Sequence, residues 1–411
     1  MFFLFSDLDC ILRYFKMILN IPDELLVKIM SNLTIQDLLQ NVALVNKRFQ
    51  QIAMDANTLK TIVLHNIDER VYQNFENVLS KARNLNKLTL KSNVLHYKHL
   101  IQVALETSKN LKSLKIIGDI PEDLAKLIFE LGQQIECLNV NKNAKKIMDF
   151  NALMHLTKLR NLKAIKIHVC FSLRSKHVTS LARNCKKLKV AQFPQIWHIS
   201  NRRWEKFCQK LKSSLQTLTF WIGDFCHWNF NSLTIMEKLT VLNIEIACYS
   251  CEIKITDEQM SNIGNIPNLK HLSLHGLWNP SIDPEIITQR FVELVPRMNL
   301  QKLTGFYFLL ECKYDLKRIH TAIIDELGTN IEHLMLACYW KKERKRLGKC
   351  RILCNVSKSM SQEHFCEILT KCPNLKSLFI NEFDLQPAFL LEIEQKHGIT
   401  LVLDEISQES L

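Results

Sequence analysis

"LNKLTL", residues 85–90, carries apolar side chains at its first, fourth and sixth positions. The same apolar-x-x-apolar-x-apolar spacing returns in "LKSLKI" at 111–116 and continues almost to the end of the chain. The middle apolar residues of the copies are Ile62, Leu88, Leu114, Leu138, Ile165, Ala191, Leu218, Leu242, Leu272, Leu303, Leu334 and Leu378. Successive ones lie 24 to 31 residues apart, except for a last interval of 44. Such a period predicts stacked repeats rather than an ordinary α/β domain.

Each repeat combines a short strand with a helix. Alternate residues of the six-residue phrase point to one side, as in a strand. Helix-period stripes lie between the phrases, as in "HVTSLARNCKKL" at 177–188 and in the segment that Pro121 opens. Units this small cannot bury their apolar faces alone, so neighbours must stack. The copy around Leu303 is irregular, because Gly305 stands where an apolar residue is expected, and "ITLVLDE" at 399–405 predicts a closing strand.

The repeats resemble the leucine-rich repeat family over roughly residues 59–405. Phrases of the form N-L-K-x-L and C-x-x-L-K are similar to its cysteine-containing subclass. The resemblance implies an α/β solenoid, a horseshoe of about 12 repeats over residues 57–411. The Asn or Cys expected in the turn after each strand is present as Asn93, Asn143 and Cys170 but is missing from most other repeats. In those repeats, other groups must form hydrogen bonds with the backbone of the turn.

A different pattern precedes the repeats at residues 19–56. Apolar stripes broken by Pro22 and by several polar residues predict three short helices, an all-α module that is marginal alone. The module resembles the F-box, which reads approximately Leu-Pro-x-Glu-x-Leu, then Asp-Leu, then Val-x-(Lys/Arg)-x-Phe. The matching residues are Ile21, Pro22, Glu24, Leu25, Ile29, Leu33, Asp37, Leu38, Val45, Asn46, Lys47, Arg48 and Phe49. Ile21 replaces the usual Leu, and Leu59 stands where Trp is frequent.

The F-box resemblance implies a role in protein degradation. F-box proteins are substrate receptors of SCF-type cullin–RING ubiquitin ligases. The F-box binds a Skp-family adaptor that bridges to the cullin scaffold, and the repeats hold the substrate for ubiquitination. Carried over residue by residue, the expected adaptor-binding residues are Pro22, Leu25, Leu26, Ile29, Leu33, Leu38, Val45 and Phe49. The sequence does not separate adaptor contact from simple packing inside the module.

The resemblance also implies a concave face, lined by the strand residues that alternate with the buried leucines. Counting the register places Lys87, Lys91, Lys115, Lys166, His168, Trp221, His271, His275 and Phe306 on that face. Its first half is basic and its second half aromatic, which predicts an acidic or phosphorylated segment on the lysines and an apolar anchor near Trp221. The alternative is that these side chains pack among themselves.

The charge of the chain favours acidic partners. The formal net charge is +13, and residues 1–65 hold six basic and six acidic residues, so the excess lies after residue 65. An acidic or phosphorylated protein fits such a surface, nucleic acid is a more distant alternative, and general solubility is the plainest one. The long last interval contains a cationic insertion near residues 340–354, "WKKERKRLGKCRILC". It is either a solvated loop, a nuclear import signal or an electrostatic contact.

The cysteines and the N-terminal residues bear on location. Fourteen cysteines without a regular framework predict free thiols in a reducing compartment, cytoplasmic and/or nuclear. Residues 1–18 form a short extension that makes a poor signal peptide, and Met17 is an alternative start. No apolar run is long enough to span a bilayer.

No motif predicts a catalytic centre, a metal or a cofactor. Phosphate loops, G-x-S-x-G and H-E-x-x-H are absent from the sequence, and Cys248 and Cys251 form an isolated C-x-x-C. The sequence therefore predicts a non-catalytic receptor subunit. The competing hypothesis is a binding scaffold that carries an F-box and repeats but acts without ubiquitin transfer.

Overall fold

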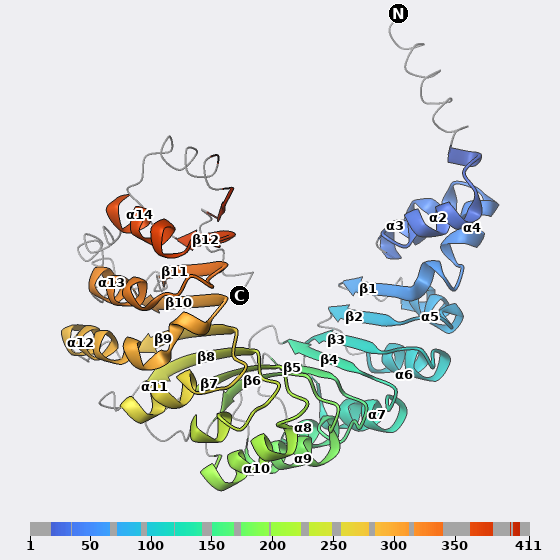
Figure 1. Cartoon of the computed structure of the whole chain (residues 1–411). Helices are drawn as coiled ribbons and strands as arrows, with labels where there is room; N and C mark the ends of the chain where they lie inside the picture. The colour runs from blue at the N-terminus through green and yellow to red at the C-terminus, as the bar shows by residue number, and fades with distance from the viewer. Residues whose placement is uncertain are drawn as a thin grey trace, which may run out of the picture. The chain divides into compact units, whose positions relative to one another are not determined.

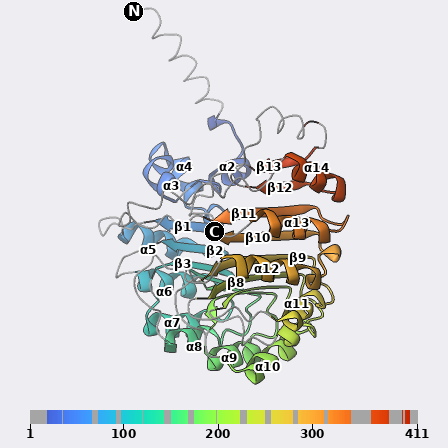
Figure 2. The same cartoon turned by 90° about the vertical axis from the view of Figure 1, so that its left-hand side faces the viewer.

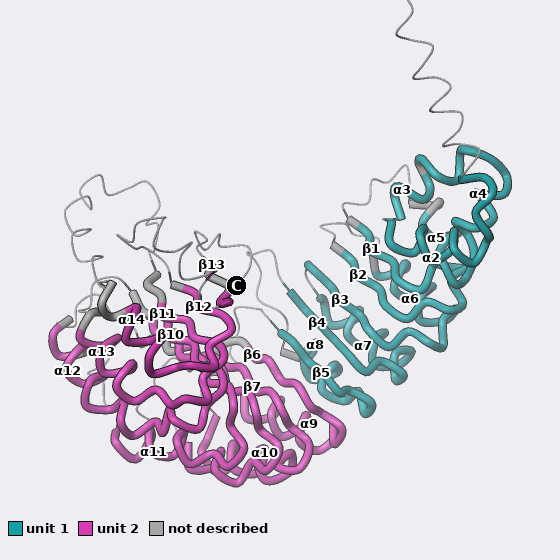
Figure 3. The backbone as a smooth tube through the Cα atoms, turned by 45° about the horizontal axis from the view of Figure 1, so that its top comes forward, with its two compact units in different colours: residues 1–169 teal, residues 170–411 magenta. Residues whose placement is uncertain are grey.

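The computed structural model describes residues 18–33, 35–65, 72–91, 97–118, 120–141, 150–167, 174–196, 199–222, 230–248, 256–278, 284–311, 316–339, 362–380, 395 and 398–402. The chain divides into two compact units, Met1–Val169 and Cys170–Leu411 (Figure 3). Within each unit, parallel strands follow one another in chain order with helices between them. The expected α/β leucine-rich-repeat solenoid behind a helical module is confirmed.

The first unit begins with the helical module and continues with five strands. The module consists of α2 (Asp23–Met30), α3 (Ile35–Gln40), the 3-10 turn η1 (Val42–Leu44), α4 (Lys47–Ala53) and the 3-10 turn η2 (Thr58–Lys60). The strands are β1 (Thr61–His65), β2 (Lys87–Lys91), β3 (Ser113–Ile117), β4 (Cys137–Asn141) and β5 (Ala164–Ile167), and the helices between them are α5 (Tyr72–Lys81), α6 (Tyr97–Thr107), α7 (Glu122–Leu131) and α8 (Phe150–Leu156). Figures 1 and 2 show α5, α6 and α7 along one side of the strands.

The second unit repeats this arrangement. Its strands are β6 (Val190–Ile196), β7 (Thr217–Ile222), β8 (Val241–Cys248), β9 (His271–Trp278), β10 (Gly305–Glu311), β11 (His333–Tyr339), β12 (Ser377–Ile380) and β13 (Thr400–Val402). Its helices are α9 (Ser175–Asn184), α10 (Asn201–Leu211), η5 (Phe230–Leu233), α11 (Asp257–Gly264), α12 (Pro284–Leu294), η6 (Val295–Met298), η7 (Leu300–Lys302), α13 (Leu316–Glu326) and α14 (Gln362–Lys371). β13 confirms the predicted closing strand, since it pairs with β12.

The middle apolar residue of each phrase occupies one row of the sheet in each unit. Leu88 pairs with Ile62 on one side and Leu114 on the other, and Leu242 pairs in the same way with Leu218 and Leu272. These six side chains are at most 1% exposed, because the helices cover them. We call the opposite side of each sheet, where the alternating residues lie, the strand face.

The irregular repeat has a different register from the one predicted. Its middle apolar residue is Phe306, which pairs with Leu272 and Leu334, and not Leu303. The turns η6 and η7 lengthen the segment before β10 and bury Leu300 in the turn, so Leu303 becomes the first apolar position of its phrase. Phe306 is fully buried. The prediction that it lies on the substrate-binding face was therefore wrong.

One polar position ties several of the repeats to the one before. The residue that precedes the first apolar position donates its side-chain amide to a backbone carbonyl of the previous repeat. Five such bonds run from Gln134 to Ser108 (3.5 Å), from Asn161 to Gln133 (2.8 Å), from Asn268 to Glu237 (2.7 Å), from Asn330 to Gln301 (3.3 Å) and from Asn374 to Thr329 (2.9 Å). In the irregular repeat this position is Lys302, whose Nζ donates to Gly264 O and to Ile266 O, the latter at 2.7 Å. Burial lowers the pKa of Lys302.

Several cysteines are core residues. Cys185, Cys208 and Cys372 are buried, and burial raises the pKa of all three thiols, to about 12 for Cys185 and about 11 for Cys372. They pack as small apolar side chains. Within the described ranges, no helix combines the length and the apolar composition needed to cross a bilayer.

Some sequence predictions fall outside the described residues. They are the extension up to residue 17, the turn residues Asn93, Asn143 and Cys170, the face residue His168 and the basic insertion at 340–354. Lys91 belongs to β2, but its side chain is outside the description.

Candidate functional site

The strand face of the first unit presents the predicted lysines. Lys87 is exposed at the start of β2. Lys115 and Lys166 are half-buried and lie on β3 and β5, with Asn139 of β4 in register between them. Since neighbouring strands lie about 4.8 Å apart, the two lysine backbones are about 10 Å apart. The three cations can therefore contact one acidic segment that crosses the strands.

In the second unit, Trp221, Glu245 and His275 form a row across three neighbouring strands. The Trp221 side chain is 37% exposed and hydrogen-bonds the carboxyl group of Glu245. The Glu245 Oε2 and His275 Nδ1 atoms are 3.9 Å apart. The sequence analysis placed Trp221 and His275 on this face but did not select Glu245, which the sheet register brings between them.

The Trp221 row carries little charge near neutral pH. Burial raises the pKa of Glu245 to about 7, although the Trp221 hydrogen bond opposes that shift. Burial lowers the pKa of His275 to about 4. His275 is therefore neutral and Glu245 is about half protonated at pH 7, so their contact is only partly electrostatic. The row suits an apolar or aromatic group that can also accept or donate one hydrogen bond.

A second row contains His271, Gly305, His333 and Ser377 on successive strands. A Cβ atom on Gly305 would lie 2.2 Å from His271 Nδ1, so glycine gives the histidine ring its space. His333 Nδ1 and Ser377 Oγ form a hydrogen bond of 2.7 Å. Burial lowers the pKa of His271, and the nearby His333 lowers it further. The predicted face residue His271 thus lies in a close-packed row with Gly305 and His333.

The helical module separates the predicted adaptor-binding residues into two groups. Leu26, Leu38 and Phe49 are 2%, 3% and 7% exposed and form its core. For these three residues, the structure shows the packing role that the sequence left open beside adaptor contact, because α2, α3 and α4 pack over them. The remaining five are all exposed: Pro22, Leu25, Ile29, Leu33 and Val45.

Apolar exposure is concentrated in this module. Nine large apolar side chains are exposed among the described residues, and six of them lie between residues 18 and 45. Leu25 and Ile29 share one flank of α2 at the i, i+4 spacing, and each is 52% exposed. Leu44, which the sequence interpretation did not select, is the most exposed at 76%. A folded domain rarely leaves so many apolar side chains in water unless a partner covers them.

Two polar residues of the closing motif hold the module together. The Asn46 side chain accepts a hydrogen bond from Phe49 N at 2.8 Å and so caps α4. The Arg48 guanidinium donates to the carbonyls of Leu19 and Ile21 and to the Asp23 carboxylate, the last at 2.8 Å from Nε. These bonds fix the start of α2 against α4. They explain why a polar pair lies inside an apolar motif.

Residues 18–65 match the family model for an F-box-like domain. The chain carries an F-box-like domain ahead of its repeats. Among solved structures, the chain is similar to one described as the complex of Rad7 and Elc1 in yeast, with a TM-score of 0.41 and 14% sequence identity over 98% of this chain and 97% of that one. No curated protein matches the chain in sequence.

The F-box-like domain leads directly into the first repeat. The Thr58 hydroxyl donates to Ile52 O at 2.7 Å, and Leu59 at the junction is 1% exposed. Leu59, which stands where the F-box pattern often has Trp, is therefore a buried joint residue. No three His, Cys, Asp or Glu side chains in the described part of the chain are grouped as metal ligands, and Cys251 of the C-x-x-C pair lies outside that part.

Proposed function

We propose that this protein is the non-catalytic substrate-recognition subunit of an SCF-type ubiquitin ligase. Its F-box-like domain docks a Skp-family adaptor, the adaptor joins it to the cullin scaffold, and the repeats hold a substrate for ubiquitination. The observation that carries the proposal is the concentration of six exposed apolar side chains between residues 18 and 45. Pro22, Leu25, Ile29, Leu33 and Val45 contact the adaptor, and Leu26, Leu38 and Phe49 support them from inside.

The strand faces supply the substrate site in this proposal. Lys87, Lys115 and Lys166 contact acidic or phosphorylated residues, and the Trp221 row contacts an apolar side chain. The protein would act by holding its substrate near the conjugating enzyme, which raises the effective concentration of the acceptor lysines. The reducing compartment predicted from the cysteines, cytoplasmic and/or nuclear, belongs to the same proposal.

Reconstitution tests the adaptor part of the proposal. The full chain is mixed with a Skp-family adaptor and a cullin, and co-elution is measured by gel filtration. We expect the Leu25→Asp/Ile29→Asp variant to lose both partners, because a carboxylate cannot be buried against an apolar adaptor surface without a partner. Lys28→Asp, on the same helix and exposed, is the matched control and keeps both. Retention of the adaptor by the double variant would refute this docking surface.

The second candidate function is a scaffold that binds the adaptor without ubiquitin transfer. To test this, the wild-type chain and Leu25→Asp/Ile29→Asp are each expressed in cells whose proteasome is inhibited, and the proteins bound to each are recovered. The receptor function predicts bound proteins that carry ubiquitin only with the wild type. Equal recovery without ubiquitin in both samples would favour the scaffold.

A further inference from the structure

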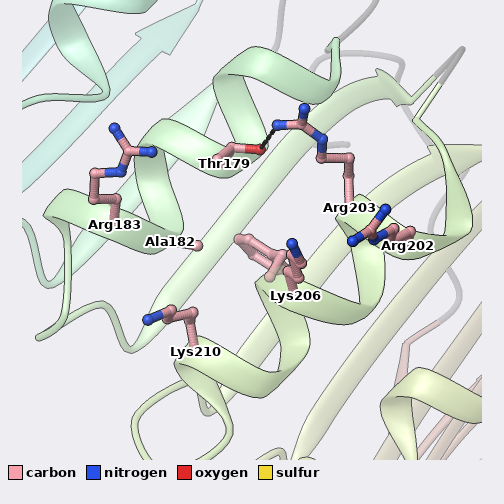
Figure 4. Close-up of a pocket in the computed structure, with 8 residues that line it drawn as sticks. Thr179, Ala182, Arg183, Arg202, Arg203, Lys206 and Lys210 are labelled. Atoms are coloured by element: carbon pink, nitrogen blue, oxygen red, sulfur yellow. Dashed lines mark hydrogen bonds between the residues drawn. The ribbon is translucent and has the colours of Figure 1, made fainter.

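A cationic hollow lies between two helices of the second unit, away from the strand face. It has a volume of about 480 Å³, and α9 and α10 form its walls. The cationic residues that line it are Arg183, Arg202, Arg203, Lys206 and Lys210. Figure 4 shows these side chains on the two helices, with the Arg203 guanidinium reaching Thr179 of α9 at 3.2 Å.

The segment that contains α9 and α10 is strongly cationic. Residues 174–216 contain eleven lysines and arginines but only one acidic residue, Glu205, whereas the whole chain has a net charge of +13. Glu205 does not line the hollow. Within the described residues, none of the five lining cations forms an ion pair. An opposite charge from outside would relieve their repulsion.

The hollow has a rigid base. Trp204, Phe207, Cys208 and Leu211 lie on the buried flank of α10. The Trp204 and Phe207 rings stack with centroids 5.2 Å apart, and Trp204 also meets Phe220 of β7 edge-on at 5.6 Å. The packed rings fix α10 on the sheet. The backbones that carry the cations are therefore already in place before a ligand arrives, which reduces the entropy cost of binding.

The lining favours phosphate over other anions. Three of the five cations are arginines, whose planar forks bind phosphate oxygens in pairs. The aromatic rings at the site, Trp204 and Phe207, are at most 1% exposed, so bases of a nucleic acid strand would find no ring to stack on. Beyond η5, the next helix along the solenoid is α11, which begins with the exposed residues Asp257 and Glu258. A long polyanion such as duplex DNA would meet these carboxylates.

We propose that the α9–α10 hollow binds a phosphorylated segment of a partner protein. Arg203 and Lys210 are seven residues apart on α10, which corresponds to about 10 Å along the helix axis. Two phosphorylated residues three positions apart in an extended peptide are separated by about the same distance. A doubly phosphorylated peptide can thus place one phosphate near Arg203 and the other near Lys210. Ala182 and Phe207 give the hollow an apolar floor for the peptide between them.

This site is separate from the adaptor surface and from the strand faces. If the hollow does not bind a phosphorylated peptide, the proposed receptor function still stands. Adaptor binding, measured separately for each variant, tests the receptor function independently of peptide binding. The proposal concerns only residues of α9 and α10, which both belong to the second unit.

The test measures peptide binding to the full chain by fluorescence anisotropy at physiological salt. The probe is a 12-residue labelled peptide with two phosphoserines three positions apart in a Gly/Ala/Ser background. Its unphosphorylated form, inositol hexakisphosphate and 20-nucleotide single- and double-stranded DNA serve as competitors. We expect Lys206→Glu/Lys210→Glu to raise the Kd at least about tenfold, because phosphate contacts become repulsive.

Lys186→Glu/Lys189→Glu is the matched control. It makes the same charge change in the same segment at exposed lysines that do not line the hollow, and it should change the Kd less than about threefold. Arg183→Glu changes a cation on α9, the opposite wall of the hollow, and should likewise weaken peptide binding. Equal weakening by the control pair, or equal binding of the unphosphorylated peptide, would overturn the proposal. So would displacement of the peptide by DNA at lower concentration, or binding of inositol hexakisphosphate alone.

Discussion

The flank of α2 that carries Leu25 and Ile29 gives a quantitative prediction for adaptor affinity. Both side chains are truncated to alanine, which keeps the helix propensity of the segment high. Complete burial of one leucine or isoleucine contributes about 1.5–3 kcal/mol. Each side chain is 52% exposed. Docking can therefore bury about half of each and gain about 1.5–3 kcal/mol from the pair. Since 1.4 kcal/mol is a factor of ten, we expect Leu25→Ala/Ile29→Ala to weaken binding about 10- to 150-fold.

The assay compares three variants by isothermal titration with a Skp-family adaptor at 25 °C. Lys28→Ala changes an exposed polar side chain of the same helix and should leave the Kd within about twofold of wild type. Leu26→Ala removes a side chain that is 2% exposed, so it should cost about 2–5 kcal/mol of folding free energy in the domain. Urea unfolding and the hydrogen exchange of α2 measure this loss of stability, and so separate it from the loss of a contact with the adaptor.

This prediction assumes that the apolar residues exposed in the free protein are the ones that contact the adaptor. It is refuted if Leu25→Ala/Ile29→Ala binds the adaptor within about twofold of wild type while α2 remains protected from exchange. The adaptor would then dock on the other exposed group, around Leu44 and Val45. Loss of binding in the Lys28→Ala control would also contradict it.

Three further predictions follow from single contacts. Gly305→Ala should cost about 1–3 kcal/mol of stability in urea unfolding because its Cβ overlaps the His271 ring, and adding His271→Ala should restore most of that loss; additive effects would contradict the overlap. Since the folded pKa of Glu245 is raised to about 7, its protonation stabilises the fold at low pH and this term is lost as the pH rises. Relative to wild type, Glu245→Gln should therefore gain about 2 kcal/mol between pH 4.5 and 6.5, and an unchanged difference would show that the carboxyl is solvated. Arg48→Met should cost about 1–3 kcal/mol in the F-box-like domain, read as faster amide exchange in α2 and α4, because three acceptors lose a charged donor.

The sequence predicted the repeats well because their signal is periodic. Eleven of the twelve middle apolar residues lie in the expected row, and the exception shows why one failed. Leu300, Leu303 and Phe306 are spaced by three, so two registers fit the same letters. The turns η6 and η7 select the second one, and their presence depends on the left-handed Asn299 between them rather than on any apolar spacing.

The functional surfaces were less accessible to sequence reasoning. Leu25 and Leu26 are adjacent and chemically identical, but one faces water and the other the core. Only the packing of α4 against α2 distinguishes them. The cationic hollow was missed because charge was counted over the whole region after residue 65. A local count over residues 174–216 would have found the segment, although not the gap between α9 and α10.

The sheet register holds across very unequal lengths of chain. β11 and β12 pair from His333 with Ser377, 44 residues apart, in the same way that β1 and β2 pair across 26 residues. The bond from Asn374 to Thr329 closes the longer interval as other asparagines close the shorter ones. The number of residues between two neighbouring strands can therefore change, in evolution or by engineering, without changing how the strands pair. A reporter domain or an affinity tag inserted between β11 and β12 would be attached at a defined point of the sheet, and the binding residues on the other strands would keep their positions.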